Sequence, residues 1–241
     1  MDLTIRPLTP DLWTALVDLF GAKGACSGCW CMYWRIGNEY TKRPGRENRA
    51  ALHDLVMAGP PPGLLAFHED LPVGWCQLTP RAALLWLDKT WRLKRVDDLP
   101  VWSLSCFYIR IGYRRKGVTT ALIRAALQAA RQAGAPALEA YPLDAALTPS
   151  TSSTGYLTTF ERLGFIEVAR HVPPRPIMRH DLENLGIDDL LGNLVNRNFK
   201  KKKPDDHRYL TDQFPGKVHF ALDRNLRGWL NRPIVPRNRF R

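Results

Sequence analysis

A short basic loop between an apolar run and an alanine-rich run is the segment of this sequence best suited to chemistry. Residues 101–110 are typical of a strand, Arg114-Arg115-Lys116-Gly117 follows, and residues 118–133 have the spacing of an amphipathic helix. Such a loop aims unpaired backbone N–H groups and the positive end of the helix dipole at one point. Gly117 would let a ligand approach the backbone closely. The loop therefore predicts a pyrophosphate-binding site, with a basic surface helix as the alternative.

Two other phosphate-binding loops are excluded by their spacing. A Walker A loop needs a glycine five residues before Gly-Lys-Ser/Thr, and a dinucleotide-binding loop needs Gly-x-Gly-x-x-Gly. The sequence contains neither pattern. The basic loop must therefore belong to another class of phosphate site.

The flanking sequence predicts alternating strands and helices that position the loop. Thr9-Pro10 supplies a helix cap and a first-turn proline, Gly59-Pro60 ends a second helix, and Gly134 ends the helix after the basic loop. Residues 21–37 are expected to form a loop, and residues 81–100 show a mixed pattern that assigns no element. The expected strands are 3–8 at a sheet edge, 63–68, 73–78, 101–110, 137–141, 165–169 and 176–182, and the expected helices are about 10–20, 47–58, 118–133 and 156–163.

The spacing Arg114-x-x-Gly117-x-Thr119 resembles the coenzyme A loop of the GCN5-related N-acetyltransferase (GNAT) superfamily, whose pattern is Arg/Gln-x-x-Gly-x-Gly/Ala. The run from Phe160 to Phe165 resembles the family's Tyr-x-x-x-Gly-Phe, and the order of elements is also similar. The resemblance implies a mixed α/β fold, with a central, mostly antiparallel sheet flanked by helices. It predicts an acetyltransferase domain over residues 1–182 and a basic, partly irregular C-terminal extension over residues 183–241.

The resemblance also implies acetyl-CoA as cosubstrate and direct transfer of its acetyl group to a primary amine, without a covalent enzyme intermediate. In the family, backbone groups of the strand before the loop bind the pantetheine arm, and the loop binds the pyrophosphate. Thr119 departs from the family's glycine or alanine. The implied cofactor-binding residues are Phe107, Ile109, Arg114, Arg115, Lys116, Gly117, Val118, Thr119 and Thr120.

The expected proton donor is missing from its usual place. Many relatives carry a catalytic tyrosine on the late helix, and the matching residue here is Phe160, which cannot donate a proton. Tyr141, at the end of the strand after the cofactor helix, and Tyr156 are the candidate acids, with water or the amine as alternatives. Glu139 shares a strand face with Tyr141, and Asp144 follows in the loop, so either carboxylate is a candidate base.

A second cluster combines thiols and aromatic rings between residues 26 and 34. In the family this segment borders the acceptor site, so Trp30, Tyr33 and Trp34 are candidates for a substrate-binding wall, with loop packing as an equal alternative. Three of the five cysteines lie here, but no second Cys or His pair completes a zinc site, so we expect free thiols and no metal. The stretch also resembles a bacterial GNAT subgroup of undefined substrate.

Charge and hydropathy set the expected partners and location. The 241 residues carry a formal net charge of +12, and a lysine run at residues 200–203 lies among interleaved aromatic residues in the extension. This composition is typical of a solvated tail. The alternative function is that of an acyl-CoA-binding regulatory protein, or of a protein that contacts nucleic acid or the ribosome through the tail. No apolar run approaches the length of a membrane span, so we expect a cytoplasmic protein with no membrane contact. A homodimer is among the expected assemblies, and the sequence does not fix the oligomeric state.

Overall fold

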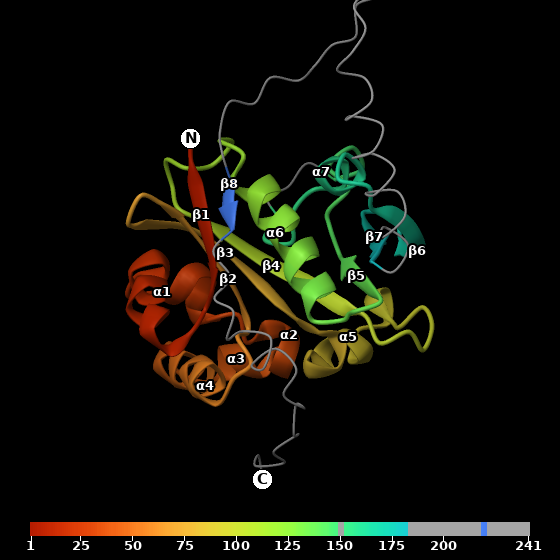
Figure 1. Cartoon of the computed structure of the whole chain (residues 1–241). Helices are drawn as coiled ribbons and strands as arrows, with labels where there is room; N and C mark the ends of the chain where they lie inside the picture. Colours follow the sequence, from red (N-terminus) through yellow and green to blue (C-terminus); the bar gives the residue numbers. More distant parts are fainter. Residues whose placement is uncertain (149–151, 183–217, 221–241) are drawn as a thin grey trace, which may run out of the picture.

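The computed structural model describes residues 1–148, 152–182 and 218–220, and forms one mixed sheet between two layers of helices (Figure 1). Eight strands are hydrogen-bonded in the order β6-β7-β5-β4-β3-β2-β1-β8. Five of the seven pairings are antiparallel, and only β4·β5 and β1·β8 are parallel. The strands are β1 (Leu3–Pro7), β2 (Gly63–His68), β3 (Leu71–Pro80), β4 (Trp102–Ile109), β5 (Ala137–Ala140), β6 (Ile166–Val172), β7 (Arg175–Asp181) and β8 (Val218–Phe220).

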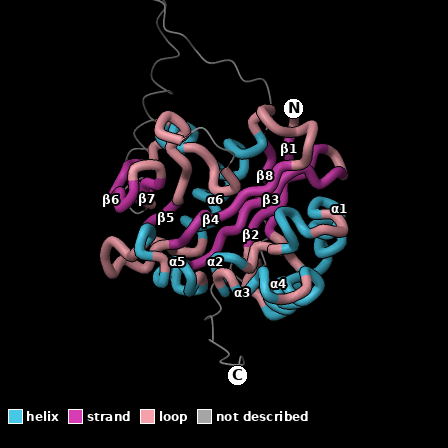
Figure 2. Tube along the Cα trace, turned by 180° about the vertical axis from the view of Figure 1, so that it is seen from behind, coloured by secondary structure: helices cyan, strands magenta, loops and turns pink. Residues whose placement is uncertain are grey.

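Helices cover the two faces of the sheet unequally. The long helix α6 lies across one face, and the view from behind shows the N-terminal helices on the other face (Figure 2). Alternation along β2 serves both layers, because Leu64 packs on the α6 side and Leu65 packs with α1 and α4. The helices are α1 (Trp13–Phe20), α2 (Tyr33–Ile36), α3 (Glu39–Lys42), α4 (Gly45–Ala58), α5 (Leu85–Lys89), α6 (Val118–Gln132) and α7 (Leu157–Glu161), with short helical turns η1 (Pro10–Leu12), η2 (Gly24–Gly28), η3 (Arg81–Ala83) and η4 (Trp91–Leu93).

The two central strands β4 and β5 pair over only part of their length. Their parallel register runs from Trp102 opposite Leu138 to Leu104 opposite Ala140, and there the pairing ends. On its other edge β4 stays paired with β3 as far as Ile109. The second half of β4 therefore has one backbone edge that β5 leaves open.

Close packing of α6 on the sheet fixes where the basic loop lies. A Cβ atom added to Gly74 on β3 would stand 2.6 Å from Cγ1 of Val118, far inside van der Waals contact. Only glycine at that position lets α6 begin so near the sheet. The start of α6 and the loop before it are therefore held against the end of β4.

Several sequence-based expectations differ from the structure in detail. The strand expected at an edge has β2 on one side and β8 on the other, so it is an inner strand. The segment 21–37 contains the turn η2 and the helix α2, and the unassigned segment 81–100 contains η3, α5 and η4. These short elements depend on contacts with distant strands, and local periodicity does not report such contacts.

Candidate active site

The basic loop has the backbone geometry of an open helix start. Gly117 is the N-cap of α6 with φ 82°, and no side-chain hydrogen bond caps the first turn. A Cβ atom on Gly117 would meet nothing within 4 Å, so the space in front of the helix is free. Arg114, Arg115 and Lys116 are exposed around it, whereas Val118 is buried. The unpaired N–H groups of the first turn and the helix dipole thus face an open position, and three exposed cations lie in the loop before it.

The open edge of β4 presents backbone donors next to this loop. The N–H of Phe107 donates to the carbonyl oxygen of Ser153 at 2.6 Å, so it faces the side that β5 leaves unpaired. Because alternate residues of a strand direct their backbone groups to the same edge, the N–H of Ile109 faces that side as well. Phe107 and Ile109 therefore both direct an N–H group to this edge, and the N–H of Phe107 already has an internal acceptor.

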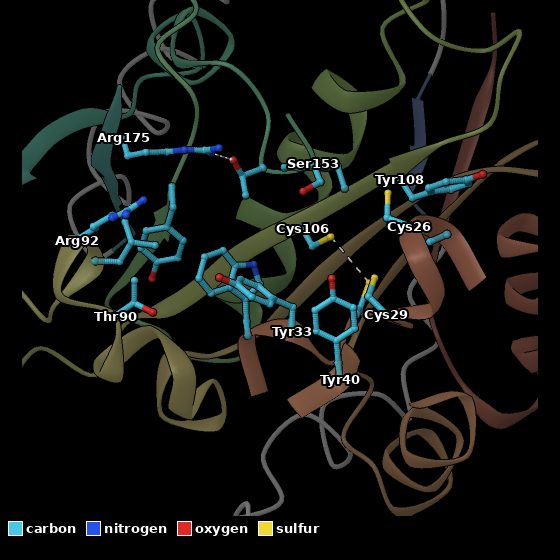
Figure 3. A pocket seen from close by; sticks show the side chains of 17 residues that line it. Cys26, Cys29, Tyr33, Tyr40, Thr90, Arg92, Cys106, Tyr108, Ser153 and Arg175 are labelled. Atoms are coloured by element: carbon cyan, nitrogen blue, oxygen red, sulfur yellow. Dashed lines mark hydrogen bonds between the residues drawn. The ribbon is translucent and has the colours of Figure 1, made fainter. Parts of the chain in front are cut away.

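A cavity of about 310 Å³ lies beside the same stretch of β4 (Figure 3). Segments far apart in the sequence bring its lining together: residues 25–40, the region of η4, β4, the end of β5, the loop before α7, and the start of β7. Its lining residues are Ala25, Cys26, Cys29, Cys31, Tyr33, Trp34, Tyr40, Thr90, Arg92, Leu93, Cys106, Phe107, Tyr108, Tyr141, Ser153, Thr154 and Arg175. Among these described residues there is no aspartate, glutamate or histidine.

The predicted aromatic wall is placed in two different environments. Tyr33 and Trp34 line the cavity, and Nε1 of Trp34 donates to the carbonyl oxygen of Ser105 on β4 at 2.9 Å. That bond pins α2 to the strand. Trp30 is instead buried in the layer under α1, where its ring packs against Phe20 with centroids 5.4 Å apart. It is not among the residues that line the cavity.

The thiols form one end of the cavity. All five cysteines are free. Sγ of Cys31 donates to Sγ of Cys106 at 3.9 Å, and Nε1 of Trp75 donates to Sγ of Cys31 at 3.1 Å. The hydrogen bond between the thiols raises the pKa of Cys31, as does burial, and lowers the pKa of Cys106, whose thiolate it stabilises. No group of three or more His, Cys, Asp and Glu side chains within the described ranges is placed to hold a metal ion.

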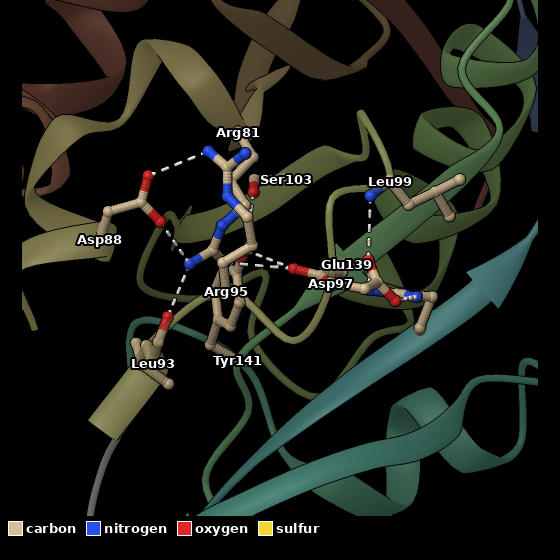
Figure 4. A network of polar contacts seen from close by, with 10 residues as sticks. Arg81, Asp88, Leu93, Arg95, Asp97, Leu99, Ser103, Glu139 and Tyr141 are labelled. Carbon is tan, nitrogen blue, oxygen red and sulfur yellow. Dashed lines mark hydrogen bonds and ion pairs between the residues drawn. The ribbon is translucent and has the colours of Figure 1, made fainter. Parts of the chain in front are cut away.

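Glu139 and Tyr141 are brought together, as the alternation along the strand predicts, but inside a buried network (Figure 4). Nη1 of Arg81 donates to Oε2 of Glu139 at 3.1 Å and to the hydroxyl of Tyr141 at 2.8 Å. Tyr141 donates to Oε2 of Glu139 at 3.1 Å and lies 2.7 Å from Oγ of Ser103. Nη2 of Arg179 donates to the other carboxylate oxygen, Oε1 of Glu139, at 2.7 Å. We call these five residues the buried network.

Burial sets the properties of the Tyr141 hydroxyl. The side chain is fully buried although its ring borders the cavity. Burial first, and then the charge of Glu139, raises the pKa of Tyr141 well above its ordinary value. The phenol is therefore protonated at neutral pH and is fully hydrogen-bonded within the protein.

The other two predicted catalytic residues, Asp144 and Tyr156, do not line the cavity. Asp144 is ion-paired with Arg170 at 2.9 Å and does not line the cavity, and Tyr156 is a partly exposed residue at the start of α7. Phe160 is fully buried, with its ring 6.3 Å from that of Phe107 and 5.1 Å from that of Phe165. Phe160 thus serves the hydrophobic core at the place where relatives carry their acid.

A comparison with protein families settles the relationship that this geometry suggests. The model of the acetyltransferase (GNAT) family matches residues 29–156, which is just over half of the chain and includes β4, the basic loop and the cavity's thiols Cys29, Cys31 and Cys106. This chain belongs to the GNAT acetyltransferase family. It is accordingly an acetyl-CoA-dependent acetyltransferase with the GNAT fold.

Several solved structures are similar to this chain at low sequence identity. YncA of Salmonella typhimurium, with its cofactor acetyl-CoA, is 16% identical over 76% of this chain and 96% of its own, with a TM-score of 0.46. The PaiA N-acetyltransferase of Thermoplasma acidophilum, in complex with coenzyme A, is 16% identical over 75% and 99%, with a TM-score of 0.43. The loading GNAT-like domain of CurA from Lyngbya majuscula is 13% identical over 76% and 99%, with a TM-score of 0.47. No curated protein matches this sequence significantly.

For this acetyltransferase, reasoning from the sequence missed most of the cavity lining. Arg92 and Arg175 at one end, and Tyr40, Cys106 and Tyr108 at the other, were not among the expected site residues. Cys106 and Tyr108 could have been found, because they flank Phe107 on a strand already expected to bind the cosubstrate. The two arginines lie on elements that no local pattern links to the site.

Two expectations for this GNAT protein concern features beyond the site. No helix of the part that the structure describes is long and apolar enough to cross a membrane. The predicted nucleic-acid or ribosome contact rests on residues 183–241, of which only the backbone of 218–220 is described. That contact, the cytoplasmic location and the homodimer stay predictions.

Proposed function

We propose that this GNAT acetyltransferase moves the acetyl group of acetyl-CoA directly to a primary amine bound in the cavity beside β4. The observation that supports this most is the double use of one strand. Cys106, Phe107 and Tyr108 of β4 line the cavity, and the same strand runs into the basic loop at α6. A single rigid element thus serves the cosubstrate on its open edge and the acceptor on its face.

The residues present fit the cosubstrate. The free space in front of Gly117 and the exposed Arg115 and Lys116 suit a pyrophosphate, and the N–H of Ile109 suits an amide of the pantetheine arm. Thr119 and Thr120 are half-buried in the first turn, where a hydroxyl can add a hydrogen bond to an anion. When bound, acetyl-CoA supplies an activated thioester whose sulfur is the leaving group.

The cavity favours the neutral, nucleophilic form of an amine without a dedicated base. Its aromatic lining would desolvate an ammonium group, and two arginines would repel it. Both effects lower the pKa of a bound amine. The candidate bases are less suited, because Glu139 is buried and paired with two arginines and Asp144 is paired with Arg170.

Proton donation to the departing thiolate is proposed for Tyr141, with Tyr156 in reserve. Tyr141 borders the cavity and stays protonated, which favours it, whereas its hydrogen bond to Glu139 must break before it can donate. Tyr33, Tyr40 and Tyr108 also line the cavity and supply comparison positions. Replacing each by phenylalanine would show whether turnover depends on Tyr141 or on another phenol.

Direct transfer is proposed over an acetylated enzyme because the cavity lacks an activated nucleophile. Cys106 has a lowered pKa, but no His, Asp or Glu among the described lining residues is placed to activate it. We expect Cys106→Ala to keep turnover within about threefold, and intact-protein mass to show no acetyl adduct with acetyl-CoA alone. Cys26→Ala, at an exposed lining thiol, is the matched control. An adduct on Cys106 together with loss of turnover in Cys106→Ala would replace direct transfer by a two-step route.

The overall proposal is tested by release of free coenzyme A thiol. Wild-type protein incubated with acetyl-CoA and a library of primary amines should release thiol with at least one amine, and mass spectrometry should find the matching N-acetyl product. Thiol release that is the same with and without every amine would mean hydrolysis only. That outcome would contradict amine transfer.

A further inference from the structure

Two sets of described arginines differ sharply in their partners. Arg81, Arg170 and Arg179 each form ion pairs with two carboxylates. Arg92 and Arg175 form none within the described residues, although both line the cavity. A guanidinium that borders a cavity without a carboxylate partner is open to a ligand.

Arg175 is held in a built position at the start of β7. It is half-buried, and its Nη1 donates to Oγ1 of Thr154 at 2.8 Å. Thr154 is 4% exposed, and its hydroxyl lies 2.9 Å from Oγ of Ser152. The guanidinium is therefore oriented by a buried hydroxyl before any ligand arrives, which reduces the ordering cost of binding.

No aspartate or glutamate is among the described residues that line this end of the cavity. Burial first, and then the positive charge of Arg92, lowers the pKa of Arg175. Two cations that repel each other next to a lining without carboxylates are stabilised by a bound anion. Figure 3 shows Arg92 and Arg175 at one end, with Cys26, Cys29 and Tyr40 at the other. We call the pair the arginine end and the opposite group the thiol end.

We propose that the arginine end binds an oxyanion of the acceptor, so that the acceptor is a small amine that also carries a carboxylate or phosphate. A cavity of about 310 Å³ lies near the lower limit for small-molecule sites, which favours an acceptor of amino-acid size. Tyr33 and Trp34 would contact its apolar body. This inference rests on the proposed function, because it takes the ligand to be the acetyl acceptor. Anion binding itself is testable without turnover.

The binding test uses matched amines with and without the anion, in the absence of acetyl-CoA. The pairs are L-phenylalanine with 2-phenylethylamine, L-leucine with 3-methylbutylamine, and O-phosphoethanolamine with ethanolamine. Calorimetry should show the anionic member of at least one pair binding at least about tenfold more tightly, since one charged contact is commonly worth that much. Equal affinity within all three pairs would overturn the proposal.

Variants then test whether the preference for anionic amines depends on the arginine end. Arg175→Gln and Arg92→Gln should each remove most of the preference for the anionic member, and Arg175→Lys should restore part of it. Arg95→Gln is the control, because Arg95 lies nearby in sequence, pairs with Asp88 and does not line the cavity. Melting temperatures of all variants separate misfolding from lost binding. An unchanged preference in folded Arg175→Gln and Arg92→Gln would overturn the assignment.

Two further outcomes separate this inference from the proposed function. Anion-dependent binding that needs Arg175, in a protein that acetylates none of the amines, would leave the anion site standing and the amine transfer wrong. If Arg175→Gln instead weakens acetyl-CoA binding and leaves the amines unaffected, the arginine end serves the cosubstrate's phosphates, and the proposal is wrong.

Discussion

The buried network and the arginine end use the same side chain in opposite ways. In the buried network, every guanidinium meets a carboxylate, and Glu139 accepts from two arginines while it is 1% exposed. At the arginine end, two guanidiniums border a cavity that has no acidic group among its described residues. Arginines that are paired with carboxylates inside the protein hold the strands together. Arginines that border the cavity without a carboxylate partner indicate where an anionic ligand would bind.

The largest expected effect comes from breaking the buried network. Glu139→Ala would leave Arg81, which is 3% exposed, without a main partner, and the loss of one member of a buried pair commonly costs about 3–5 kcal/mol of unfolding free energy. Arg175→Gln should stay within about 1 kcal/mol of the parent. Urea unfolding measures both. Asp97→Asn, at the exposed partner of Arg179, is the control and should cost below about 1 kcal/mol. Equal losses of unfolding free energy for Glu139→Ala and Arg175→Gln would contradict the distinction between the buried network and the arginine end.

The cations of the basic loop also form no ion pair within the described residues, so the loop should bind an anion as the arginine end does. Gly117→Asp places a negative charge in the open space before α6, and it should raise the dissociation constant for acetyl-CoA by about 10- to 100-fold. Gly134→Asp is the matched control. Gly134 also has a positive φ and open surroundings but lies just past the other end of α6. Calorimetry that finds Gly117→Asp binding as tightly as the parent would remove the loop from the cosubstrate site.

Tyr141 tests whether the buried network is purely structural. If its hydroxyl donates a proton, Tyr141→Phe should lower turnover by at least about tenfold while acetyl-CoA affinity stays nearly intact. Ser103→Ala removes another hydrogen bond from the same hydroxyl but keeps the phenol, so it controls for damage to the network. Steady-state kinetics and melting curves are measured on both. Turnover of Tyr141→Phe within about twofold of the parent would leave water or Tyr156 as the donor.

The smallest expected effect is at the thiol end, where chelation should change nothing. Because the thiols are expected to be metal-independent, a strong chelator should leave the melting temperature of the protein unchanged, whereas loss of a structural zinc ion removes much of the folding free energy. Elemental analysis of protein purified without added metal gives an independent measurement. Stoichiometric zinc would show that Cys26, Cys29, Cys31 or Cys106 acts as a ligand.

The sequence predicted the elements whose causes are local. Helix α6 follows from its alanine-rich periodicity and from the glycines at its two ends, and its place after β4 made the basic loop visible. Alternation along the strand expected at residues 137–141 placed Glu139 and Tyr141 on one face, and they do meet. Their partner Arg81 is 58 positions away from Glu139, in the segment without a clear pattern. A single sequence contains no signal for such a pairing.

The cavity was less predictable for the same reason. Arg92 lies on a three-residue turn and Arg175 on the last hairpin, and only the folded sheet brings both to the same end of the cavity. Trp30 and Trp34 belong to one aromatic run, yet one enters the core and the other the cavity wall. Positive φ angles at Trp30 and Cys31 turn the chain between them, and composition does not report such turns.

The hydrogen bond from Phe107 to Ser153 has a consequence for the affinity of the cosubstrate. A pantetheine amide or thioester oxygen that needs the same N–H competes with a carbonyl of the protein's own chain. The apparent dissociation constant then exceeds the intrinsic one by the inverse of the fraction of molecules in which that N–H is free. Substitutions in residues 152–155 could therefore tighten or weaken acetyl-CoA binding without contacting it, by shifting an equilibrium that exists before the cosubstrate arrives.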